Sequence, residues 1–190
     1  MTEQKPTSAS DEARLWRPDL VYSTALFIAA VAAVSLQLAD TGVLAGEHGW
    51  GIAGFFLLFG LFTITTGFPH PVFGHVSFDR VAQVMSVLIL GPVDAAWIAG
   101  VASFVYPWHR LWRGVPSRRV ALAALHNSGL MILMVLGAGL LYQYLGGAFP
   151  PGTLDLGTGV LLFVLVFSMQ AINDVGMMLI LWLRRGDPRD

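Results

Sequence analysis

Cysteine is absent from the 190-residue sequence, so disulfide bonds, thiolate metal sites and cysteine nucleophiles are all excluded. Charge is scarce as well: only 12% of the residues are charged, whereas a soluble domain has about 25%. The formal net charge of -1 offers no basic excess, so we expect no nucleic-acid partner. Together these absences exclude an ordinary soluble domain.

Lysine and arginine are missing from two long stretches, Asp40 to Asp79 and Val120 to Leu183. Hydrophobic residues make up 55% of the chain, and its mean hydropathy is +0.66. Long runs without basic residues suit hydrocarbon as the solvent. The sequence therefore predicts an integral membrane protein with the lipid bilayer as its first partner.

Five apolar runs predict helices, and the third is interrupted at Gly91-Pro92. That interruption allows one kinked helix or two short helices joined in a hairpin. We favour the hairpin, which makes the fold class all-α: a polytopic transmembrane bundle of about six helical elements. The runs cover Leu20–Leu38, Trp50–Gly67, Val81–Tyr106, Val120–Tyr144 and Leu156–Leu183.

The eleven basic residues fall into the N-terminal tail, the segment 107–119, the C-terminal tail and one isolated position, Arg80. Basic segments face the cytoplasm in membrane proteins. This rule places both termini in the cytoplasm and requires an even number of crossings between 68–80 and 107–119. The expected location is the inner (cytoplasmic) membrane.

The chain divides into a tail at 1–18, a transmembrane helical domain at 19–184 and a second tail at 185–190. The first tail carries acidic residues among its basic ones, and no short apolar core with a cleavage site follows it. We therefore expect it to be retained, leading into a signal-anchor helix.

Polar side chains inside a membrane helix are costly, so each one needs a partner or a role. Six of them are candidates for ligand binding. They are Asp94, His126, Asn127, Gln170, Asn173 and Asp174.

Each candidate also has a structural explanation. Asp94 follows Pro92 at the start of a helix, where a carboxylate compensates the helix dipole. His126 and Asn127 could instead hydrogen-bond between helices. Asp174 lies on one helix face with Gln170, and we expect it to point into the bundle, towards His126 or Asn127.

Alanines recur every fourth residue at Ala25, Ala29 and Ala33, a spacing that lets helices approach closely. They are candidates for partner docking or for internal packing. His70, His75 and Asp79 match no metal motif, and we expect a structural loop there without a metal. No phosphate-binding loop, nucleophile elbow or zinc-protease motif is present in the sequence, so we expect no enzyme and no identifiable cofactor.

Four short motifs carry a resemblance to a known family: Val76–Asp79, Leu88–Ala96, His126-Asn127 and Tyr144–Gly147. From Val76 to Arg185 the chain resembles the multi-helix membrane module that is fused to HD-GYP or GGDEF cyclic-di-GMP signalling domains in bacteria. The resemblance implies a sensory module acting through a partner or a fused domain. No such catalytic domain lies within the 190 residues, so we expect neither phosphodiesterase nor cyclase activity.

The predicted six helices and the alanine repeat resemble a second family, the substrate-binding subunits of energy-coupling-factor vitamin transporters. That resemblance implies binding of a small molecule within the membrane and docking of a partner through the first helix. The two expectations are therefore a membrane sensory or ligand-binding module and, as the alternative, a subunit for transport of a vitamin-like or ionic substrate.

Overall fold

The computed structural model describes residues 17–41, 49–70, 74–76, 78–152 and 155–184. In these ranges the chain forms α2 (Arg17–Thr41), α3 (Gly49–Thr65), α4 (Asp79–Leu90), α5 (Pro92–Val105), α6 (Ser117–Tyr144) and α7 (Leu156–Arg184). These six helices confirm the all-α prediction. Three of them, α2, α6 and α7, are long and apolar enough to cross a membrane, as expected for an integral membrane protein.

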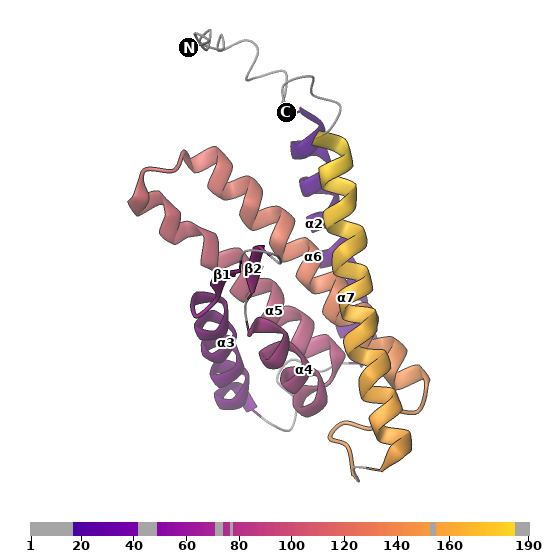
Figure 1. Ribbon diagram of the computed structural model, residues 1–190. Coiled ribbons are helices and arrows are strands. Elements are labelled where there is room, and N and C mark those ends of the chain that lie inside the picture. Colours follow the sequence, from indigo (N-terminus) through magenta and orange to yellow (C-terminus); the bar gives the residue numbers. More distant parts are fainter. Residues whose placement is uncertain (1–16, 42–48, 71–73, 77, 153–154, 185–190) are drawn as a thin grey trace, which may run out of the picture.

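The helices are arranged around α6, which packs against α5, α2 and α7 (Figure 1). The start of α2, the end of α7 and the turn before α6 all lie at one end of the bundle, which we call the basic end. Arg110, Arg113, Arg118 and Arg119 belong to that turn and to the start of α6. The opposite end contains the junction of α4 and α5.

Gly91 separates α4 from α5, as the Gly-Pro pair predicted. Its φ of 83° and ψ of 170° are backbone angles that break the helix and that residues with a side chain rarely adopt, whereas glycine adopts them readily. The Gly91 N–H still closes α4 by donating to the Val87 carbonyl at 2.9 Å. Pro92 then begins α5, a position where its missing N–H costs nothing. The two helices pack against each other, so the hairpin and not a single kinked helix is present.

Two features differ from the predicted loops. Residues Phe68–His70 (β1) and Gly74–Val76 (β2) form a short antiparallel hairpin, and Tyr106–Arg113 form a 3-10 helix, η1. At the start of α4 the N-cap position belongs to Phe78, which makes no side-chain capping bond. The residue before it, Ser77, lies outside the described residues.

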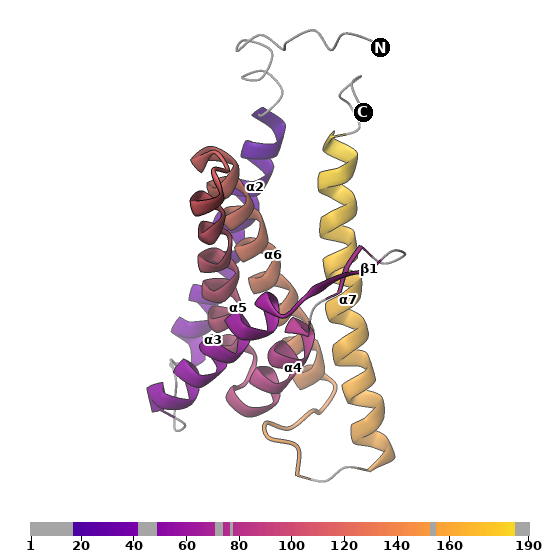
Figure 2. The ribbon, with the colours of Figure 1, turned by 60° about the vertical axis from the view of Figure 1, so that its left-hand side comes forward.

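The β hairpin lies near mid-height of the bundle (Figure 2). The 17 residues of α3 and the 12 of α4 rise about 25 Å and about 18 Å at 1.5 Å per residue. Both are shorter than the roughly 30 Å hydrocarbon core of a bilayer. The segment from α3 to α4 therefore extends from the Gly91 end only part of the way. The helix expected at 50–67 is present within two residues of its predicted ends, but its rise is less than the full thickness of the hydrocarbon core.

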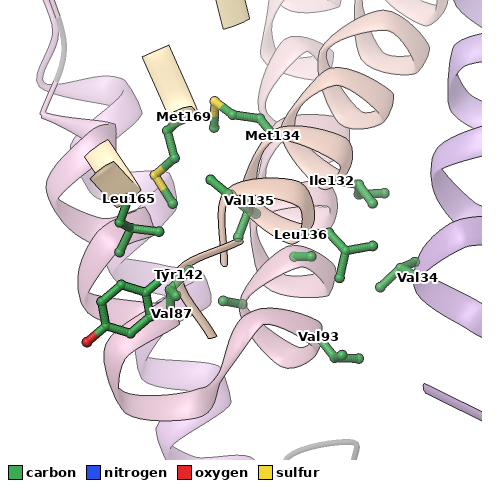
Figure 3. Packing of buried hydrophobic residues seen from close by; sticks show 14 of the residues in the cluster. Val34, Val87, Val93, Ile132, Met134, Val135, Leu136, Tyr142, Leu165 and Met169 are labelled. Carbon is green, nitrogen blue, oxygen red and sulfur yellow. The ribbon is translucent and has the colours of Figure 1, made fainter. Parts of the chain in front are cut away.

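One continuous apolar core joins five of the six helices (Figure 3). Val34 of α2, Val87 of α4 and Val93 of α5 meet the inward face of α6. Leu165 and Met169 add the contribution of α7 and are fully buried. This core fixes the height at which polar residues of α4 and α7 face each other.

Small residues permit the closest helix approaches. A Cβ on Gly129 of α6 would lie 2.9 Å from the backbone N and Cα of Phe27 in α2. On the other side of α6, the Ser128 hydroxyl donates to the Gly100 carbonyl of α5 at 2.9 Å. Ala25 and Ala29, by contrast, are exposed and Ala33 is half-buried, so the predicted alanine stripe lies largely on the outside of α2.

The first turn of α7 depends on Asp155. Its Oδ1 accepts a hydrogen bond from the Thr158 N–H at 2.8 Å, which is an N-cap bond. This bond holds the pKa of the Asp155 carboxyl below its ordinary value. A lowered pKa means that the stabilisation is present above the ordinary pKa of about 3.9 and is lost as the pH falls through the lower folded value.

We expect hydrogen–deuterium exchange to detect this loss. Protection of the amides at Gly157 to Gly159 should fall between pH 6 and pH 3 in the wild type. Asp155→Asn retains a capping side chain but cannot titrate, so its protection should not change with pH. Equal protection at both pH values in the wild type would contradict the assignment.

Candidate functional site

Arg80, in the first turn of α4, reaches across the bundle to α7. Its Nη2 donates to Oε1 of Gln170 at 3.4 Å. Its Nη1 donates to Oε1 of Gln83 at 3.1 Å and lies 2.6 Å from Sδ of Met134. Since Met134 and Gln170 belong to the middle turns of α6 and α7, Arg80 lies half-buried at mid-height of the bundle and not at the boundary expected for it.

The two amide side chains continue this arrangement in opposite directions. Nε2 of Gln83 donates to Oδ2 of Asp79 at 3.3 Å. Nε2 of Gln170 donates to Oδ1 of Asp174 at 2.7 Å. Each amide thus accepts from the guanidinium with its oxygen and donates to a carboxylate with its nitrogen. We call these five side chains the polar network.

The polar network contains two carboxylates and one guanidinium, which leaves one negative charge in excess when both acids are ionised. Charges at mid-depth of a membrane are retained only where they are paired or face water. Asp79 and Asp174 both attract the Arg80 guanidinium electrostatically. On the other side of α4, Asp79 and Gln83 line a cavity of about 20 Å³ with Ser86 and Ser103, enough for about one water molecule.

The structure brings together two of the predicted residues, Gln170 and Asp174, on one face of α7. Gln170 binds both Arg80 and Asp174, and the two residues of α7 are exposed on the side of the bundle. The expectation that Asp174 points into the bundle is therefore wrong. Neighbouring Asn173 is half-buried and does not belong to the polar network.

His126 of α6 lies away from the polar network, where α6 faces α2. Its side chain is buried, and its ring lies 5.7 Å from that of Tyr22. The Tyr22 hydroxyl in turn donates to the Gly176 carbonyl at 3.4 Å. The adjacent Asn127 is half-buried. This arrangement fits the packing explanation of His126.

Asp94 is buried in the first turn of α5 and lines two cavities. One, of about 520 Å³, lies at the Gly91 end and includes Gln37, Asp40 and Gln143. The other, of about 260 Å³, lies between α3 and α5, with Trp50 and Trp97 in its walls. Asp94 therefore retains both explanations, a helix-terminus carboxylate and a ligand-binding residue.

The α4 half of the polar network was not predicted from the sequence. Arg80 was interpreted only as an isolated basic residue in the topology, and Asp79 only as part of a structural loop without a metal. The available signal was the spacing of Asp79 and Gln83, which are four residues apart and therefore share a helix face.

Comparison with known proteins identifies no relative: no family model, no curated protein and no solved structure matches the chain. The function must therefore be argued from the arrangement of its own residues.

Proposed function

We propose that the chain is a sensory module of the cytoplasmic membrane that binds a small ligand at the polar network and responds by moving α7. Both termini face the cytoplasm in this proposal. Its topology is supported by the basic end, where the start of α2, the arginines at 110–119 and the end of α7 lie together (Figure 1).

The observation that carries the proposal is the bond between Arg80 and Gln170. Helix α7 packs on the bundle mainly through α6 and, to a lesser extent, α2. Its buried stripe is narrow and includes Leu165, Met169 and Ile180. Arg80 adds a polar link from α4, so whatever competes with this link shifts the position of α7.

The chemistry of the polar network favours a cationic ligand. Its two carboxylates outnumber its one guanidinium, and Asp174 is accessible at the side of the bundle. An amine that pairs with Asp174 would release Gln170 from Asp174 and weaken its bond to Arg80. The free energy available for moving α7 is the difference in ligand affinity between the two positions.

The proposal can be tested with simple amines. Purified protein in nanodiscs is titrated with methylammonium and putrescine, with sodium chloride as the ionic-strength control, while thermal unfolding is followed. A ligand at 100 times its Kd stabilises by about 2.7 kcal/mol, and we expect Asp174→Asn to abolish the amine-specific part. Asn173→Ala, one residue away and outside the polar network, should leave it unchanged.

An equal response of wild type and Asp174→Asn to the amines would contradict this site. So would an amine response no larger than that to sodium chloride, because the effect would then be one of ionic strength.

A second candidate function, a small-molecule transport subunit, is favoured by the two cavities that meet at Asp94. A buried carboxylate that lines cavities in a membrane protein is a candidate for binding a substrate or an ion. Uptake of a labelled amine into proteoliposomes that is lost in Asp94→Asn would favour transport over sensing. The outward alanines Ala25 and Ala29 would then offer a docking face for a partner subunit.

A further inference from the structure

A groove at the basic end is separate from the polar network and from both cavities at Asp94. Its volume is about 540 Å³, and it is formed by η1 together with the last residues of α3 and α5. The walls combine the aromatic rings of Trp108 and Trp112 with the cationic head of Arg113. Such a combination suits a molecule with a charged part and an apolar part.

The charge of this region has a single sign. Between Asp94 and Asp155 the sequence contains no aspartate or glutamate, whereas four arginines fall between positions 110 and 119. Arg113 is exposed on η1. An anion in the groove would therefore meet a positive potential with no acidic residue of this segment opposing it.

His109 is positioned by η1 itself. Its Nδ1 lies 2.6 Å from the Tyr106 carbonyl oxygen. Because a carbonyl can only accept, Nδ1 is the donor in this bond, and in the protonated form of the ring Nε2–H is a second donor that can bind an anionic ligand. The Tyr106 ring lies 4.8 Å from the imidazole and supports the same orientation.

The apolar part of the groove and its location point to a lipid. Val105 and Leu111 line the groove and are both exposed. Trp112 is 92% exposed, and tryptophan at a bundle end is typical of the membrane–water interface. Basic pockets between helices on the cytoplasmic side are sites for anionic lipid headgroups.

We propose that this groove binds an anionic phospholipid. The phosphate lies against Arg113 and His109, and the upper part of an acyl chain lies against Val105 and Leu111. The proposal rests on the membrane placement given above but not on the ligand of the polar network. A bound lipid would hold η1 and the start of α6 at the headgroup level.

Native mass spectrometry in detergent tests this proposal with an equimolar mixture of phosphatidylglycerol and phosphatidylcholine. The wild type should retain phosphatidylglycerol preferentially. Arg113→Gln should reduce that preference about fivefold, the factor expected for one basic residue near an anionic surface. Arg110→Gln removes an exposed charge of the same helix that does not line the groove, and should change the preference less than about twofold.

A second variant keeps the charge and removes the space. Val105→Trp fills the groove, and we expect it to lower lipid retention without changing the elution volume of the purified protein. Equal losses in Arg113→Gln and Arg110→Gln would overturn the proposal, since diffuse attraction would then explain them. Displacement of the lipid by millimolar inorganic phosphate would overturn it too, because the groove would then be a site for a soluble anion.

Discussion

Replacing Arg80 with alanine should cost about 1–3 kcal/mol of folding free energy, the range for removing one partner of a hydrogen bond in the protein interior. The guanidinium donates hydrogen bonds to Gln83 and Gln170 and contacts the Met134 sulfur. Without it, the oxygens of Gln83 and Gln170 lose their shared donor, and the attraction of Asp79 and Asp174 to the guanidinium is removed. Denaturant titration in mixed micelles, followed by far-UV circular dichroism, measures the loss.

A double-mutant cycle separates this effect from lost packing. If the charges interact, Asp174→Asn should cost less in the Arg80→Ala background than in the wild type, with a coupling of about 0.5–3 kcal/mol. Arg80→Lys keeps the charge but loses the two-pronged geometry, so it should retain part of the stability. Strictly additive losses for Arg80 and Asp174 would contradict a shared polar network.

The second large effect is expected at Gly129. Alanine there would place a Cβ 2.9 Å from the Phe27 backbone and 3.0 Å from the Leu26 carbonyl carbon. A backbone cannot rotate away as a side chain can, so α2 must shift from α6. Overpacking of this kind costs about 1–3 kcal/mol, measured as the change in the free energy of unfolding.

Gly137→Ala is the matched control on the same helix. Its new Cβ would meet only the tip of Ile172, at 3.4 Å, and position 137 is exposed. Both variants gain the same helix propensity, up to about 1 kcal/mol. We therefore expect Gly137→Ala to be neutral or stabilising. Equal stabilities of the two variants would show that α2 and α6 are not in close contact.

Most of the helix pattern could be predicted from the sequence because apolar runs and breakers are local signals. The predicted runs end close to the ends of α2, α6 and α7, and Gly91-Pro92 divides α4 from α5 as favoured. The run at 50–67 likewise ends within two residues of α3. The strands β1 and β2 that follow α3 were not predicted, because hydropathy alone does not distinguish a short hairpin from a loop.

The candidate site was predicted only in part because its two halves are 90 residues apart. Gln170 and Asp174 share a helix face, which spacing alone reveals. Arg80, which binds Gln170, could not be predicted as a member of the site, because the sequence does not reveal that α4 starts at mid-height of the bundle (Figure 2). His126 looked equally promising as a polar residue in an apolar run, and only its contact with Tyr22 favours the packing explanation.

In our proposal, Arg80 links α4 to α7 through Gln170 and so sets the position of α7. The absence of native cysteine allows nitroxide labels at Met85→Cys and Val175→Cys, two exposed positions on these helices. Their distance distribution, measured by pulsed electron paramagnetic resonance in nanodiscs, should be narrow in the otherwise unaltered chain. With Arg80→Gln added, we expect a longer mean distance between the labels and a broader distribution. An unchanged distribution would contradict a role of Arg80 in positioning α7.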